Sequence, residues 1–269
     1  MSLIHKLHDI TITGKANHHW YESDFYAQGS AQFGSWSIYV DLFIRKFRVF
    51  YPILHMWSTY TDNKLFDKPH KRRMSLKEKI QYEVFMTETT DQPLMELCSY
   101  REKRTLFYKM NCSNLRNGRD ELLKADKYKA KDILSKAVLS LSAIHSKGKY
   151  HGDALLKNFW IGQTYDKTEE AQWIGFMHNT INMNICEKQI LDFLTLILSH
   201  KKYAKCGQEE WWDLARWTIT EIRGNVSDET AKNVLELLKQ TSEKGIFAAR
   251  RITPKERSQL TYYMESLRM

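Results

Sequence analysis

The feature that most constrains this chain is a polar loop between two apolar elements, at residues 148–160. Within it His151, Gly152 and Asp153 are consecutive, and Asn158 follows five residues after the aspartate. An aspartate and an asparagine at that spacing on a tight loop can converge on one point. There the carboxylate can accept a proton from a hydroxyl group, while the amide oxygen holds a divalent cation on a phosphate. The alternative is purely structural, with glycine supplying a positive φ in a turn and aspartate capping the next element.

The elements on both sides of this loop have clear periodic patterns. Residues 122–145 predict a helix with a wide apolar stripe: Ile133, Leu134, Ala137, Val138, Leu141 and Ile144. After the loop we expect a short strand at 159–161, a turn at 163–171 and a second strand at 172–176. Residues 188–199 predict an apolar helix that contains Asp192, whose carboxylate needs a hydrogen-bond partner in such surroundings. Three further helices are expected at 208–223, 227–240 and 254–268.

The first part of the chain has strand patterns instead. Residues 36–43, 94–100 and 104–110 predict strands, and a helix of about a dozen residues is expected to follow Ser75, which together with Glu78 fits a capping box. Glu83 is expected near the buried side of that helix. Residues 29–34 begin and end with glycine and predict a turn between strands, which is either a plain hairpin turn or a place where backbone N–H groups approach a phosphate. Residues 43–50 mix basic and apolar side chains, as in a strand with a basic face or a segment lying on an anionic membrane surface.

These patterns together predict an α+β protein with two lobes. The β-rich part is residues 1–111 and the mainly helical part is residues 112–269, joined by a loop rich in asparagine and serine at 111–118. The chain has 269 residues, of which 42% are hydrophobic and 27% charged, so it can bury a sizeable core.

Net charge and cysteine spacing limit which kinds of partner and which cellular compartment we expect for this chain. The formal net charge of +9 favours anionic partners, although no basic stripe interleaved with aromatic residues indicates nucleic acid. The four cysteines are widely spaced, as expected of reduced thiols, and no zinc-ligand spacing is present. Neither a signal-peptide pattern in residues 1–15 nor an apolar run of membrane-spanning length is found, which predicts a cytoplasmic protein.

The order helix, His-Gly-Asp-x-x-x-x-Asn, strand, turn, strand and Asp-bearing helix resembles the catalytic core of the protein-kinase-like fold. It is most similar to small atypical bacterial kinases, the lipopolysaccharide Kdo/heptose kinases and the aminoglycoside-phosphotransferase-like families. The resemblance is strongest from about 130 to 200, weaker from 75 to 118, and poor from 20 to 74. It implies a bilobal fold, ATP and Mg²⁺ as cofactors, and an anionic acceptor that carries a hydroxyl group.

The resemblance also implies roles for individual residues. Asp153 would be the catalytic base, Asn158 a metal ligand, and Lys157 a contact to the phosphate. His151 and Asp192 would support the loop. The resemblance also assigns residues to the nucleotide. Glu83 would pair with a lysine that binds the nucleotide, and Lys64 is a candidate for this lysine. Met110 and Cys112 would form the hinge beside adenine, and Gly29 and Gly34 would lie near the phosphates.

Two departures from the family pattern favour a second hypothesis. The family places a metal-binding aspartate where this chain has Gly175, and glycine has no side chain to bind Mg²⁺. The nucleotide-binding lysine is not obvious, since Lys64 lies in a polar stretch, Lys46 lies further from Glu83, and Asp41 occupies the most natural position. The sequence therefore leaves three functions open: an ATP-dependent phosphotransferase, a catalytically impaired pseudokinase that acts as a binding or regulatory protein, or a nucleic-acid-binding protein that uses the positive charge.

Overall fold

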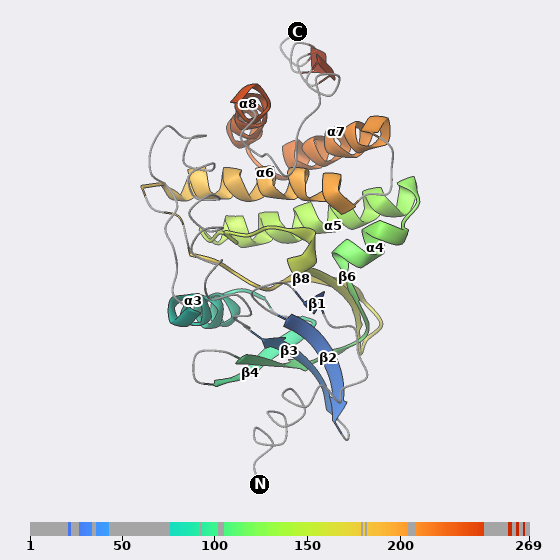
Figure 1. Cartoon of the computed structure of the whole chain (residues 1–269), viewed down its shortest axis with the longest axis vertical. Coiled ribbons are helices and arrows are strands. Elements are labelled where there is room, and N and C mark those ends of the chain that lie inside the picture. The colour runs from blue at the N-terminus through green and yellow to red at the C-terminus, as the bar shows by residue number, and fades with distance from the viewer. Residues whose placement is uncertain are drawn as a thin grey trace. The chain divides into compact units, whose positions relative to one another are not determined.

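The structure is a computed structural model of the whole chain (Figure 1). It describes residues 21–22, 27–33, 36–42, 76–91, 93–101, 105–178, 180, 182–203, 208–244, 258–259, 262–263 and 266. The predicted α+β class is confirmed, because the described residues form two sheets and a larger set of helices.

The larger sheet is antiparallel and has five strands in the order β1-β2-β3-β5-β4. Its strands are β1 (Tyr21–Glu22), β2 (Ala27–Phe33), β3 (Trp36–Leu42), β4 (Met95–Arg101) and β5 (Thr105–Met110). The predicted turn from Gly29 to Gly34 is wrong in its first half, because Gly29 lies within β2 and is paired with Val40. The alternating residues around Gly29 extend the strand until Phe33 pairs with Trp36.

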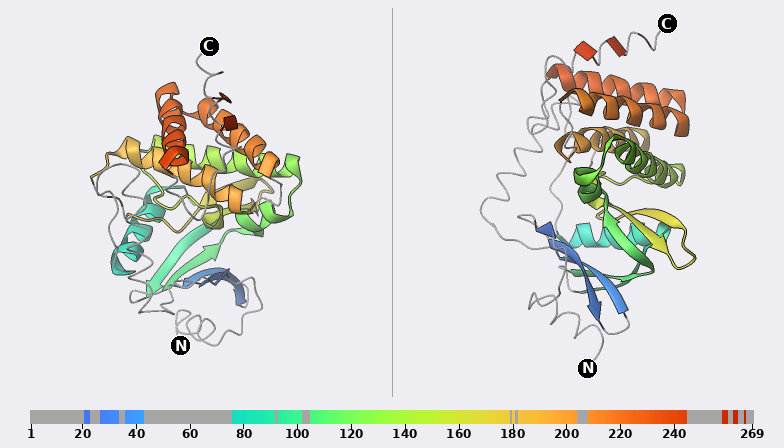
Figure 2. Two further views of the ribbon diagram at one scale, coloured as in Figure 1. Left: turned by 45° about the horizontal axis from the view of Figure 1, so that its top comes forward. Right: turned by 90° about the vertical axis from the view of Figure 1, so that its right-hand side faces the viewer.

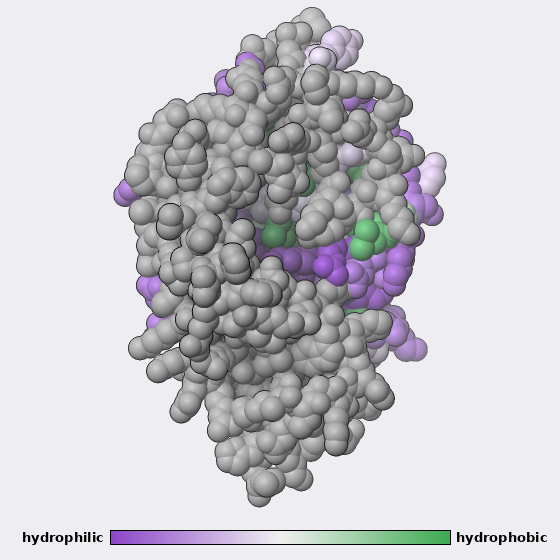
Figure 3. Space-filling view, in the orientation of Figure 1, coloured by the Kyte–Doolittle hydropathy of each residue, from purple (hydrophilic) through white to green (hydrophobic). Residues whose placement is uncertain are grey.

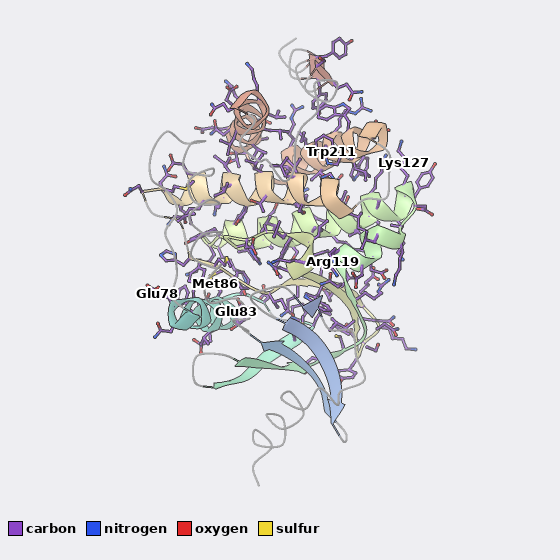
Figure 4. All side chains as sticks on the ribbon, viewed as in Figure 1. Glu78, Glu83, Met86, Arg119, Lys127 and Trp211 are labelled. Atoms are coloured by element: carbon purple, nitrogen blue, oxygen red, sulfur yellow. The ribbon has the colours of Figure 1, made fainter. Side chains whose placement is uncertain are left out.

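Helix α3 (Leu76–Thr89) contacts β4. Its buried side carries Glu83, Met86 and Thr87, of which Glu83 and Met86 are labelled in Figure 4. Phe85 is 46% exposed, so it does not belong to the buried face of this helix. The Thr87 hydroxyl donates to the main-chain oxygen of Glu83 at 2.9 Å, one turn earlier.

The second sheet has the order β6-β7-β8, formed by β6 (Cys112–Asn117), β7 (Phe159–Thr164) and β8 (Glu169–Trp173). Here two expectations are wrong. Residues 111–118 contain a strand rather than a loop, and β8 ends at Trp173, so residues 174–176 are not part of the predicted strand. Pairing within the sheet outweighs the low strand propensity of the asparagine- and serine-rich segment.

The remaining elements are mostly helices: α4 (Gly118–Lys124), α5 (Lys127–Ser146), the short 3-10 helix η1 (Leu156–Asn158), α6 (Ile185–Tyr203), α7 (Gln208–Asn225) and α8 (Asp228–Lys244). The single helix predicted over 122–145 is instead two helices, because the Asp126 side chain accepts a hydrogen bond from Lys129 N and caps α5. Figure 2 shows α5 to α8 gathered into one helical body.

The chain divides into two compact units. Unit 1 comprises residues 1–55, 74–115 and 162–172, and unit 2 comprises residues 56–73, 116–161 and 173–269. The core of unit 2 includes the predicted stripe of α5 and much of α6, with Phe159, Phe176 and Phe193 fully buried. No helix among the described residues is long and apolar enough to cross a bilayer, and the coloured residues on the face drawn in Figure 3 are mainly hydrophilic.

Candidate functional site

The loop at residues 150–158, in unit 2, begins where α5 ends. Gly148 follows the helix with φ +68° and donates its N–H to the carbonyl oxygen of His145, which is the usual way a glycine ends a helix. The chain then runs through His151 to η1 and continues directly into β7. The loop is therefore held at both ends by regular elements.

A buried carboxylate holds the first turn of this loop. Asp192 on α6 is 1% exposed, and its two oxygens accept the backbone N–H groups of His151 at 2.6 Å and Gly152 at 2.7 Å. His145 Nε2 lies 3.1 Å from the same carboxylate. Two charge-assisted hydrogen bonds from consecutive backbone amides fix the direction of the loop against α6.

His151 orients the backbone of Asp153. The imidazole is fully buried, and its Nδ1 accepts the N–H of Asp153 at 3.1 Å, while Nε2 lies 3.0 Å from the carbonyl oxygen of Ile174. This pattern requires the neutral tautomer with the proton on Nε2. Burial lowers the pKa of His151, which agrees with a neutral ring at pH 7.

Asp153, Lys157 and Asn158 come together at the end of the loop. Asn158 Nδ2 donates to the main-chain oxygen of Asp153 at 2.8 Å and to its Oδ2 at 3.1 Å, and Lys157 Nζ lies 3.7 Å from that same Oδ2. The Asp153 and Lys157 side chains are 22% and 23% exposed, so both reach solvent. The five-residue spacing thus places a carboxylate, an ammonium group and an amide at one point.

Residues 174–178 run beside this loop and are bonded to it. Ile174 N donates to the carbonyl oxygen of Asn158 at 3.0 Å, and Met177 N donates to that of His151 at 2.8 Å. Tyr150 Oη and His178 Nδ1 are hydrogen-bonded as well. These contacts explain why residues 174–176 do not continue β8.

Gly175 lies directly against Asn158. Its φ is +77°, and a Cβ placed on it would lie 3.1 Å from Asn158 Oδ1. The side chain that the family pattern has at this position would therefore begin beside the amide oxygen predicted to bind metal. Glycine adds no carboxylate beside Asn158, whose Nδ2 donates to Asp153 Oδ2.

The donors at this point fit a magnesium ion that is held mainly by phosphates and water. Mg²⁺ is often bound by one or two protein carboxylates together with substrate phosphates, and Asp153 with Asn158 offers one carboxylate and one amide oxygen. Within the described part of the chain no group of three or more His, Cys, Asp or Glu residues could form a cage for a metal.

The predicted nucleotide-binding residues that are described lie in unit 1. Glu83 is 1% exposed on α3, Met110 is the last residue of β5, and Cys112 is the first of β6. Cys112 is buried against Gly162, where an added Cβ would lie 3.1 Å from the Cys112 Sγ. Burial raises the pKa of the Cys112 thiol to about 11, so the thiol is neutral at pH 7. Lys64, Gly34 and Lys46 lie outside the described residues.

Several residues around the loop were missed in the sequence. Asn117 accepts from Arg119 N as the cap of α4 and donates from Nδ2 to the carbonyl oxygen of Lys157 at 2.8 Å. An asparagine before an acidic first turn is a recognisable helix start, so this residue had a signal. Tyr150, His178 and Lys188, whose Nζ lies 4.8 Å from the Tyr150 ring centre, had none, because only the fold brings them together.

No protein-family model and no curated protein sequence matches this chain. Among solved structures, it is similar to WaaP in complex with acyl carrier protein, with 11% identical residues and a TM-score of 0.43. The similarity covers 89% of this chain and 92% of that one. A likeness of this size does not establish an activity.

Proposed function

We propose that this protein is a kinase-like phosphotransferase that moves a phosphoryl group from ATP to a hydroxyl acceptor. The observation that carries the proposal is the convergence of Asp153, Lys157 and Asn158 on a loop that the buried Asp192 holds in place. The Asn158 amide also bonds the main-chain oxygen of Asp153 and would serve a plain turn, whereas a plain turn has no need of the Lys157 ammonium group beside the carboxylate.

Each of these residues has a role in the proposed reaction. Asp153 accepts the proton of the acceptor hydroxyl as its oxygen bonds to the γ-phosphorus, and the bond from that phosphorus to the bridging oxygen breaks, releasing ADP. Lys157 would contact the transferred phosphoryl group, whose negative charge its ammonium group would offset. His151 and Asp192 position Asp153 through the backbone and do not touch the substrate.

Asn158 would hold the magnesium ion, which when bound neutralises charge on the nucleotide phosphates. For the nucleotide itself the proposal assigns Glu83, Met110, Cys112, Gly29, Gly34 and Lys64, all by resemblance. The acceptor is proposed to be anionic because the chain carries a net charge of +9, and a lipopolysaccharide sugar is proposed by resemblance alone.

A pseudokinase is the second candidate, and Gly175 is the observation that favours it. Without a carboxylate at this position, the metal has one protein ligand fewer than in the family pattern. Such a protein would bind a nucleotide or a partner without transferring phosphate.

The first experiment is Mg²⁺-dependent ATP turnover by the full chain, compared with an Asp153→Asn variant. Removing a general base costs about 10²–10⁴-fold in rate, so turnover should fall by that factor while nucleotide affinity changes little. Absent turnover, or turnover equal in both proteins, would contradict the catalytic role of Asp153 and leave the pseudokinase.

The second experiment compares Gly175→Asp with Gly175→Ala. Both variants place a Cβ against Asn158 and share the cost of the positive φ, which aspartate tolerates better than most residues. Only the aspartate adds a metal ligand, so its turnover should exceed that of the alanine variant by about 10²-fold. Equal rates in the two variants would show that the missing carboxylate does not limit the site.

A further inference from the structure

A polar cavity lies in unit 2, between α5 and α7. Its volume is about 250 Å³, and Lys127, which Figure 4 labels at the start of α5, forms part of its wall. The cavity is lined by Lys127, Lys131, Asp213, Arg216, Trp217, Thr220 and Tyr263. None of these residues belongs to the loop that carries Asp153.

The lining has an excess of positive charge. Lys127 Nζ lies 2.6 Å from one oxygen of Asp213, and Arg216 Nη2 lies 3.3 Å from the other. The hydrogen bond from Lys127, with the charges of Lys127, Arg216 and Lys131, holds the pKa of Asp213 below its usual value. Three cations surround this one carboxylate, so the lining carries a net charge of +2.

The framework behind these charges is rigid. Trp217 donates its indole N–H to Ser135 Oγ at 3.1 Å, which ties α7 to α5 and fixes the ring. Lys131 Nζ lies 4.4 Å from the centre of that ring. The two helices contact each other, and each has buried residues, such as Leu134 on α5 and Thr218 on α7. The backbone positions that carry the cations are therefore held together, while the Lys127 and Arg216 side chains are 53% and 52% exposed and can reach a ligand from solvent.

The cavity is remote from the candidate active site. Lys127 begins α5 and the loop follows its other end, after 20 residues. At 1.5 Å per residue the two ends are about 30 Å apart, so one small ligand cannot occupy both places. A function of the cavity is thus additional to the proposed transfer reaction.

We propose that this cavity binds a small phosphomonoester. A dianionic phosphate matches the net charge of +2, and the guanidinium group of Arg216 can bond two phosphate oxygens at once while Lys131 supplies a second cation. The volume is below the usual range for drug-sized ligands, which favours a phosphate with a short organic part. Free phosphate and a sugar phosphate share this chemistry, and their affinities tell them apart.

The test is isothermal titration calorimetry on the full chain carrying Asp153→Asn, so that turnover contributes no heat. The probes are glucose 6-phosphate, inorganic phosphate and glucose. Arg216→Gln removes a cavity cation, and Arg223→Gln makes the same charge change on an exposed position of the same helix. We expect Arg216→Gln to bind glucose 6-phosphate with an affinity at least about 10-fold lower than that of the Asp153→Asn parent, and Arg223→Gln to bind it with the parent's affinity.

The proposal would be overturned by phosphate binding undetected up to about 10 mM, by an Arg216→Gln affinity equal to the parent's, or by an equal loss in Arg223→Gln. Glucose binding as tightly as its phosphate would do the same. Tighter binding of glucose 6-phosphate than of inorganic phosphate would identify the ester as the ligand; equal affinities would identify the phosphate group alone. The result does not depend on whether Asp153 is catalytic, since both variants are compared in the same background.

Discussion

Gly152 lies where the loop passes close to the backbone of Met177. Its φ is +81°, and a Cβ on it would lie 1.9 Å from the carbonyl oxygen of Met177. That oxygen belongs to a backbone segment bonded to the loop, so neither side can move away without breaking hydrogen bonds. The glycine between His151 and Asp153 is therefore required by space as well as by conformation.

We expect Gly152→Ala to lower the free energy of unfolding by about 2–4 kcal/mol, because it adds a backbone clash to the cost of a positive φ. Gly148→Ala is the matched control: its φ is +68°, but no atom lies within 4 Å of its Cβ position, so it should lose only about 1 kcal/mol. Urea unfolding of both variants measures the difference. Equal losses would show that the close approach to Met177 does not exist.

At the scale of elements, α6 supports the loop through one side chain. Asp192 lies on this apolar helix and accepts hydrogen bonds from the backbone N–H groups of His151 and Gly152. Removing its carboxylate would leave these buried donors without an acceptor. The carboxylate is thus a positioning group, which links the packing of α6 to the geometry of the proposed base.

Replacing Asp192 by asparagine should cost about 3 kcal/mol or more, because the amide keeps the shape but turns an N–H₂ group toward a backbone donor. The backbone amides of His151 and Gly152 should also exchange with solvent faster, as measured by hydrogen exchange. Asp132→Asn is the control, since its ion pair with Lys136 is exposed and should be worth less than about 1 kcal/mol. Unchanged exchange at residues 151 and 152 would contradict the role assigned to Asp192.

The helices were the part of the fold that the sequence predicted best. The helices expected at 188–199, 208–223 and 227–240 are confirmed, and each continues past its predicted last residue. They were recognisable because each has an apolar stripe that recurs at the helical period. Strand β6 was missed, since its stability comes from pairing with distant residues rather than from its own asparagine- and serine-rich composition. The same limit applies to Gln172, whose side chain bonds the backbone of Leu94 and Met95.

The candidate site was predictable only in part. The spacing of Asp153 and Asn158 indicated convergence, and their hydrogen bonds agree with it. The place of Gly175 against Asn158 depends on bonds between residues 151 and 177 and between 158 and 174, which no periodic pattern encodes. Roles of the residues in unit 1 remain predictions from resemblance.

At the scale of the whole molecule, two buried histidines connect stability to pH. His200 on α6 is fully buried beside Trp211, and both of its ring nitrogens lack a hydrogen-bond partner among the described residues. Burial lowers its pKa from 6.5 to about 3, and burial also lowers the pKa of His151. Both rings are therefore neutral in the folded protein at pH 7.

This arrangement predicts acid sensitivity with a definite sign. Below pH 6.5 an unfolded histidine gains a proton, while folded His200 does not until about pH 3, so the unfolded chain binds more protons in this range. Stability is full above pH 6.5 and falls as the pH drops, by up to about 1.4 kcal/mol per pH unit for each such histidine. Urea unfolding at several pH values between 6.5 and 4.5 gives the free energy of unfolding as a function of pH. This free energy should fall less steeply with decreasing pH in His200→Leu than in the parent protein, because the variant has one histidine fewer to protonate on unfolding. The same slope in both proteins would mean that His200 is solvated or paired, contrary to its burial beside Trp211.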